Sequence, residues 1–77
     1  MFKISKIQVR LDTQKEIYDF VNLASSIDVP VYLEDGTGFR ANAKSIMGVM
    51  YGTVEFSHLY VLSEYDKLET KFNKFII

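Results

Sequence analysis

Hydrophobic and polar residues alternate near the start of the chain. Ile7, Val9 and Leu11 are separated by single polar residues, and this period of two predicts a strand with one buried face and one solvated face. Phe2 and Ile4 lie in the opposite phase. The change of phase predicts either a bulge between the two sets or an N-terminal extension that packs separately.

The pattern changes to a helical period after residue 13. Apolar residues then recur with the spacing of an amphipathic helix, at Ile17, Phe20, Val21, Ala24 and Ile27. Thr13 and Glu16 have the spacing of a capping box, in which the threonine oxygen accepts a hydrogen bond from the N3 amide and the glutamate accepts one from the cap. We therefore expect a helix over about residues 14–26.

Two extended segments follow, at residues 29–34 and 39–43, and the first is rich in β-branched and aromatic residues. The sequence Asp-Gly-Thr-Gly at residues 35–38 separates them and predicts a hairpin turn, so the two strands should pair antiparallel. This turn lacks the further glycine and the lysine of a phosphate-binding loop. Pro30 has no amide hydrogen to donate and belongs at the entry of its strand.

The rest of the chain predicts a short helix, a strand and a final helix. Ser45 precedes an apolar run that we expect to form a helix ending at Gly52. Residues 58–62 are typical of a strand, and Ser63 and Asp66 are placed to begin the final helix. The apolar face of that helix is Leu68, Phe72, Phe75 and Ile76. Its solvated face carries Lys67, Lys71 and Lys74.

The order of these elements predicts the fold class. Strand, helix, strand, strand, short helix, strand and helix can bury one face of a four-stranded antiparallel sheet under helices and leave the other face to solvent. We expect an α+β open-faced β-sandwich that forms a single domain over residues 1–77, since a chain of 77 residues has no room for a second core.

Composition and charge remove several classes of function. Nine basic and ten acidic residues give a net charge of −1, which offers no electrostatic footprint for nucleic acid or an anionic membrane. The chain has no cysteine and a single histidine, His58, so we expect no metal site and no cofactor. No pair of carboxylates has the spacing for acid and base catalysis, so we expect no enzyme. Without a leader or membrane segment in the sequence, a cytoplasmic location is expected.

Residues 42–50, Asn-Ala-Lys-Ser-Ile-Met-Gly-Val-Met, closely resemble the segment that carries the regulatory serine in HPr. HPr is the phosphocarrier of the bacterial sugar phosphotransferase system. Residues 20–25 look like the first helix of HPr and residues 31–34 like its second strand. The resemblance extends over about residues 13–62, with one extra residue near the turn at 35–38. It implies an HPr-like fold and a role related to that transport system.

The resemblance fails at the residue on which HPr carries phosphate. In that family a histidine just before the first helix accepts phosphate, within a motif of leucine, histidine, alanine, arginine, proline and alanine. The motif places Thr13 at the histidine, Lys15 at the arginine and Glu16 at the proline. A threonine ester is too stable to pass phosphate onward, lysine lacks the planar fork of arginine, and a glutamate repels an anion. The resemblance therefore implies an HPr-like protein that carries no phosphate at Thr13.

Two interpretations remain open at each of the other candidate positions. Ser45 is a helix cap, or a site that a kinase phosphorylates as the resemblance implies. Ile46, Met47 and Met50 are core residues, or part of the patch that the family uses to bind protein partners, which Tyr51 would extend.

The N-terminus of the first helix offers a further candidate site. Its free amides and positive dipole, with Thr13 and Lys15, predict at most weak anion binding. His58 is read as an ordinary surface or half-buried histidine, and the alternative is that it serves as a relocated acceptor in a working phosphocarrier. The preferred hypothesis is a regulatory or protein-binding module with a protein partner.

Overall fold

The computed structural model describes residues 3–77, so Phe2 lies outside the described residues. Its sheet has the strand order β1-β4-β2-β3, and every neighbouring pair is antiparallel. The strands are β1 (Ser5–Val9), β2 (Val31–Glu34), β3 (Arg40–Asn42) and β4 (Leu59–Ser63). The predicted four-stranded antiparallel sheet is therefore confirmed.

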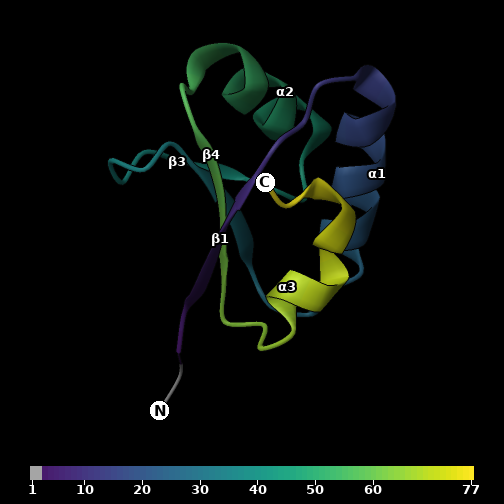
Figure 1. Ribbon diagram of the computed structural model, residues 1–77, viewed down its shortest axis with the longest axis vertical. Helices are drawn as coiled ribbons and strands as arrows, with labels where there is room; N and C mark the ends of the chain where they lie inside the picture. Colours follow the sequence, from purple (N-terminus) through teal and green to yellow (C-terminus); the bar gives the residue numbers. More distant parts are fainter. Residues whose placement is uncertain (1–2) are drawn as a thin grey trace.

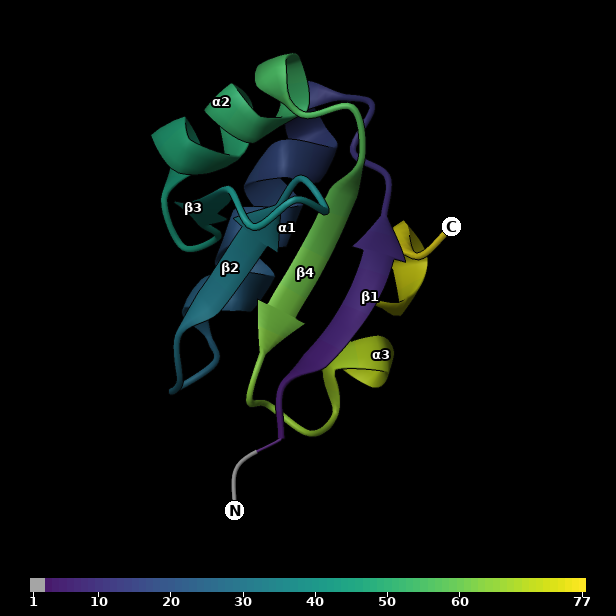
Figure 2. The ribbon, with the colours of Figure 1, turned by 90° about the vertical axis from the view of Figure 1, so that its left-hand side faces the viewer.

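Helices cover one face of this sheet and leave the other open. They are α1 (Gln14–Ser25), α2 (Ile46–Glu55), α3 (Leu68–Lys71) and a short 3-10 helix, η1 (Asn73–Phe75). In Figure 1 the sheet is seen nearly edge-on, with α1 and α3 on one side of it and α2 across its end. Figure 2 shows the open face, where the strands lie in front of α1 and α3. The predicted open-faced α+β architecture is confirmed.

The core lies between the sheet and α1, with the final segment of the chain beside it. Leu33 and Val61 are partners in the register of β2 and β4, and both side chains are fully buried. Phe20 of α1 is also buried, and its ring centroid lies 5.0 Å from that of Phe72 and 5.7 Å from that of Phe75. These aromatic contacts attach the C-terminal segment to α1.

The change of phase between Ile4 and the residues Ile7 and Val9 does not require a bulge. The pairing of β1 with β4 runs without interruption from Ser5 opposite Ser63 to Val9 opposite Leu59. Ile4 lies on the open face because successive residues of an extended chain point to opposite sides, and it is 55% exposed.

The chain after β1 lies against the C-terminal segment. The Arg10 amide donates to the Phe75 carbonyl at 2.8 Å, and Val9 forms an antiparallel bridge with Ile76. The Ile77 amide donates to the Gln8 carbonyl at 3.2 Å. Residues 75–77 therefore cover part of the outer edge of β1.

The prediction that the second helix ends at Gly52 is wrong, because α2 continues to Glu55. Gly52 is buried, and a Cβ atom at this position would lie 2.7 Å from Cδ2 of Leu33 and 3.3 Å from Cδ2 of Phe56. The glycine is therefore needed for close packing of the helix on β2. It marks a contact with the sheet, and the helix ends one turn later.

The predicted start of the final helix is also wrong. Ser63 is the last residue of β4, and its hydroxyl donates to the Pro30 carbonyl at 2.8 Å and accepts from the Tyr65 amide. Asp66 precedes α3, which begins at Leu68 without a side-chain cap. The segment then divides into α3 and η1, and Leu68, Phe72 and Phe75 are buried as predicted.

The hairpin between β2 and β3 forms as predicted. Gly36 and Gly38 have φ angles of 94° and 102°, a region that favours glycine. The Asp35 carboxylate accepts hydrogen bonds from the hydroxyl and the amide of Thr37, both at 2.7 Å, and these two bonds lower its pKa. The strand that follows is shorter than predicted, and β2 begins after Pro30.

Candidate functional site

The first candidate region is the N-terminus of α1, where the capping box is present. Oγ1 of Thr13 accepts from the Glu16 amide at 3.1 Å. In return, Oε1 of Glu16 accepts from the Thr13 amide at 3.0 Å and from the Asp12 amide at 2.9 Å. A carboxylate of the chain itself therefore occupies part of the position that a helix N-terminus offers to an external anion.

Lys15 does not face this carboxylate. Its Nζ atom lies 3.0 Å from Oδ2 of Asp19, one helical turn along α1, and Nζ of Lys74 lies 3.3 Å from the same oxygen. The hydrogen bonds from Lys15 and Lys74 lower the pKa of Asp19. The structure thus does not bring Thr13 and Lys15 together as an anion site, and the expected weak anion binding finds no geometric support here.

We expect the Glu16→Gln variant to lose part of the acid sensitivity of the native protein. The hydrogen bond from the Asp12 amide, and then that from the Thr13 amide, lower the pKa of Glu16 below its ordinary value of 4.5. Such a carboxylate stabilises the fold at pH values above 4.5, and this contribution disappears as the pH falls through the lowered pKa. Glutamine retains an oxygen for the same bonds but carries no charge.

Urea denaturation at several pH values tests this prediction. The native protein should have the higher midpoint near pH 7, and its advantage over Glu16→Gln should shrink as the pH falls from about 5 to about 3. A difference between the two proteins that stays constant over this range would contradict it.

Ser45 is the N-cap of α2. Its Oγ atom accepts from the Gly48 amide at 3.2 Å, which confirms the predicted capping role. The preceding segment is held in place, since Oδ1 of Asn42 accepts from the Lys44 amide at 2.9 Å and Nζ of Lys44 donates to the Ile27 carbonyl. The Ser45 side chain is half-buried at a fixed helix start.

The outer side of α2 carries an apolar surface, which we call the α2 patch. It consists of Ile46, Met47, Met50, Tyr51 and Val54. All five side chains are exposed, and the exposed fraction reaches 82% for Met47 and 79% for Val54. The last four line a shallow hollow together with Glu55. Contiguous exposed apolar side chains are typical of binding surfaces.

The patch is larger than the sequence indicated. Ile46, Met47 and Met50 are exposed, and Tyr51 extends the surface, while Val49 and Gly52 point inward and are buried. Val54 was missed because the helix was expected to end two residues earlier. The helical period that identified the other residues would have found Val54 if it had been continued past Gly52.

His58 lies closer to the start of α1 than its place in the sequence suggests. It precedes β4 and lines a hollow with Arg10, Leu11 and Asp12, the residues that lead to Thr13. Its side chain is exposed, and its ring centroid lies 6.4 Å from that of Tyr60. Arg10 forms an ion pair with Asp12 at 2.8 Å. The antiparallel pairing of β1 with β4 brings these two chain segments together.

Two further findings concern metal binding and membrane insertion. Residues 3–77 contain no group of three or more histidine or acidic side chains arranged to hold a metal ion. Within the same residues, no helix combines the length and the apolar character needed to cross a lipid bilayer.

Comparison with known proteins identifies two similar solved structures. The phosphocarrier protein HPr from Bacillus anthracis aligns with a TM-score of 0.65 and 25% identity, over 95% of this chain and 90% of that one. HPr-C-His from Thermoanaerobacter tengcongensis aligns with a TM-score of 0.63 and 28% identity, over 92% and 83% of the two chains. Neither a family model nor a curated protein matches the sequence. The fold is HPr-like, as the resemblance of residues 13–62 implied.

Proposed function

We propose that this HPr-like protein is a regulatory or protein-binding module related to the sugar phosphotransferase system, and that it binds its partner through the α2 patch without catalysing a reaction. The observation that carries the proposal is the exposure of Ile46, Met47 and Met50 on a helix with a firmly capped start. Flexible methionine side chains suit an adaptable contact with another protein. The partner is a protein of that system or one that regulates it, and the location is cytoplasmic.

The chemistry at α1 supports a role without phosphotransfer at Thr13. A transferable phosphoryl group in this system rests on an imidazole nitrogen, and the residue that replaces the imidazole is a hydroxyl engaged with the Glu16 amide. The Glu16 carboxylate, at hydrogen-bond distance from the Thr13 and Asp12 amides, repels a further anion. Lys15 is held by Asp19 instead of facing the helix start.

Ser45 is the proposed point of regulation. A phosphate on its hydroxyl adds between about 1.5 and 2 negative charges at the N-terminus of α2, where the helix dipole favours them. The same charge would stand beside Ile46 and Met47, the first residues of the patch. Phosphorylation therefore changes the partner preference of the α2 patch while keeping its helix intact.

The Met47→Asp variant should lose the partner. Met47 is the most exposed of the patch side chains, so the substitution leaves the core untouched while placing a charge within an apolar contact. We expect recovery of the bound protein to fall about tenfold or more, as for the loss of an interface hot spot. Quantitative mass spectrometry after affinity capture from cells that make the protein measures this.

The matched control is Tyr18→Asp, which alters an exposed apolar residue of α1 outside the patch. It should capture the same protein as the native chain. Equal recovery of that protein by Met47→Asp, with an unchanged circular dichroism spectrum, would remove the patch from the proposed function.

A second function is favoured by the position of His58. This imidazole lines the same hollow as Arg10, beside the segment that leads to α1, and an imidazole that shares a hollow with an arginine has the chemistry of a phosphoryl acceptor. Incubation with enzyme I and phosphoenolpyruvate distinguishes the two functions. Acid-labile phosphate that is lost in His58→Ala supports a carrier, and an unlabelled native chain supports the binding module.

A further inference from the structure

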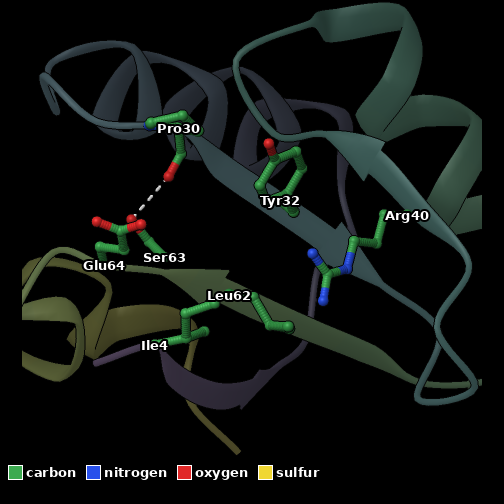
Figure 3. Close-up of a pocket in the computed structure, with 7 residues that line it drawn as sticks. All are labelled: Ile4, Pro30, Tyr32, Arg40, Leu62, Ser63 and Glu64. Carbon is green, nitrogen blue, oxygen red and sulfur yellow. Dashed lines mark hydrogen bonds between the residues drawn. The ribbon is translucent and has the colours of Figure 1, made fainter. Parts of the chain in front are cut away.

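The open face of the sheet holds a small cavity that is separate from the α2 patch (Figure 3). Its volume is about 80 Å³. Its walls come from residues far apart in the sequence: Ile4, Pro30, Tyr32, Arg40, Leu62 and Glu64. They meet because Tyr32 of β2 stands opposite Leu62 of β4, and the chain beside them supplies the rim.

Between Arg40 at one end and Glu64 at the other, the floor and sides of the cavity are mainly apolar. Leu62 is nearly buried at its base, while Ile4 and Tyr32 are partly exposed at its sides. A single water molecule occupies roughly 30 Å³, and a cavity of about 150 Å³ admits benzene. The space of 80 Å³ therefore fits a short branched aliphatic group, which would gain by leaving water.

Arg40 supplies a positive group at one end. Its Nε atom donates to Oε2 of Glu34 at 3.1 Å, and its guanidinium carbon lies 5.4 Å from the centre of the Tyr32 ring. Among the hydrogen bonds of residues 3–77, none uses the terminal nitrogens of Arg40. Figure 3 shows these nitrogens turned toward the cavity, between Tyr32 and Leu62. They form the planar edge that binds a carboxylate.

The charges beneath Arg40 leave room for a second anion. Glu34 is only 5% exposed, and its two oxygens are shared between Arg40 and Lys6, whose Nζ atom lies at 3.5 Å. Two cations thus face one buried carboxylate, so the group formed by Lys6, Glu34 and Arg40 carries one net positive charge at this end of the cavity. A carboxylate arriving at Arg40 would be attracted without displacing Glu34.

Glu64 limits the charge that the other end of the ligand can carry. In Figure 3 this carboxylate lies at the end of the cavity opposite Arg40, beside Pro30. A ligand with a second negative group at its far end would meet a like charge there. The cavity therefore selects a molecule with one carboxylate and an uncharged aliphatic end.

We propose that this cavity binds a short branched aliphatic monocarboxylate, with the carboxylate on the terminal nitrogens of Arg40 and the aliphatic group over Leu62. The site lies on the open face and α2 lies at the end of the sheet, so it goes beyond the proposed function of the patch. The same chemistry is offered by a free acid and by the carboxyl end of a peptide whose last residue is aliphatic.

Titration of the ¹⁵N-labelled protein, followed by amide chemical shifts, tests the site. With 3-methylbutanoate we expect saturable shifts at Tyr32, Leu62 and Glu64. The neutral isostere 3-methylbutanamide and the dicarboxylate 3-methylpentanedioate should each bind about tenfold more weakly. An acetylated peptide ending in leucine distinguishes the sources. Tighter binding of this peptide than of the free acid would assign the site to a chain terminus, and tighter binding of the free acid would assign it to a small molecule.

Two matched variants distinguish the role of the guanidinium group in binding from a general effect of arginine substitution on folding. Arg40→Lys keeps a positive charge beside Glu34 but removes the planar fork, so the affinity for 3-methylbutanoate should fall about tenfold. Arg10→Lys is the control, because Arg10 is the other arginine of the chain and does not line the cavity. Ile4→Asp, at an exposed wall, should abolish binding. Equal affinity of the amide and the carboxylate, or of the two lysine variants, would overturn the proposal.

Discussion

The Thr13→His variant should remain unlabelled at residue 13 when it is incubated with enzyme I and phosphoenolpyruvate. The triple variant, which combines Thr13→His with Lys15→Arg and Glu16→Pro, should take up close to one acid-labile phosphoryl group per chain. The difference arises from Glu16, whose carboxylate accepts from the amides of residues 12 and 13. An imidazole placed there alone would share the helix start with a fixed negative charge.

The triple variant removes each obstacle in turn. Proline is tolerated in the first turn of a helix, arginine provides the fork that lysine lacks, and histidine provides the nitrogen. Phosphohistidine analysis by mass spectrometry measures the outcome, with Thr13→His, Lys15→Arg as the control that retains Glu16. Full labelling of that control would show that Glu16 is no barrier.

The Phe72→Ala variant should lose about 3–5 kcal/mol of stability. Phe72 is fully buried, and its ring packs on Phe20. A domain of 77 residues has a total stability of about 4–12 kcal/mol, so this single change should remove a large part of it. Urea denaturation followed by far-ultraviolet circular dichroism measures the loss.

The matched control is Phe39→Ala, which removes the same side chain from a position that is 57% exposed. It should cost roughly 1 kcal/mol or less, since little apolar area returns to water. Equal midpoints for the two variants would mean that the contact of the C-terminal segment with α1 contributes little to stability.

Local signals in the sequence predicted the elements whose ends depend on neighbouring residues. The capping pair Thr13 and Glu16 set the start of α1 correctly, and Ser45 did the same for α2. The glycines of the hairpin also act through the conformation of their own backbone. Since each of these interactions spans four residues or fewer, no knowledge of the fold was needed.

The errors occurred where packing between distant segments decides the structure. The sequence predicts a helix end at Gly52, but its hydrogen side chain lets α2 approach Leu33 of β2. The sequence predicts that Ser63 begins a helix, but β4 includes this residue and its hydroxyl donates to the Pro30 carbonyl. Neither partner is visible from local sequence, because both contacts depend on the folded sheet.

The candidate sites also differ in whether they depend on local sequence or on contacts between distant segments. Ile46, Met47 and Met50 follow one helical period, which left open whether they are core residues or an exposed patch, and the structure shows them exposed. The hollow that His58 and Arg10 both line, and the cavity beside Arg40 and Glu64, depend on the strand order β1-β4-β2-β3. That order brings together residues more than twenty positions apart, which periodicity along the chain does not reveal.

The bonds between the C-terminal segment and β1 have a consequence for self-association. An uncovered strand edge is a template on which identical chains can stack into fibrils. Here the Gln8 carbonyl and the Arg10 amide already hold partners from residues 75–77, and Lys6 adds a charge farther along the same strand. At the opposite edge, β3 is only three residues long. Both margins of the sheet thus discourage the growth of amyloid.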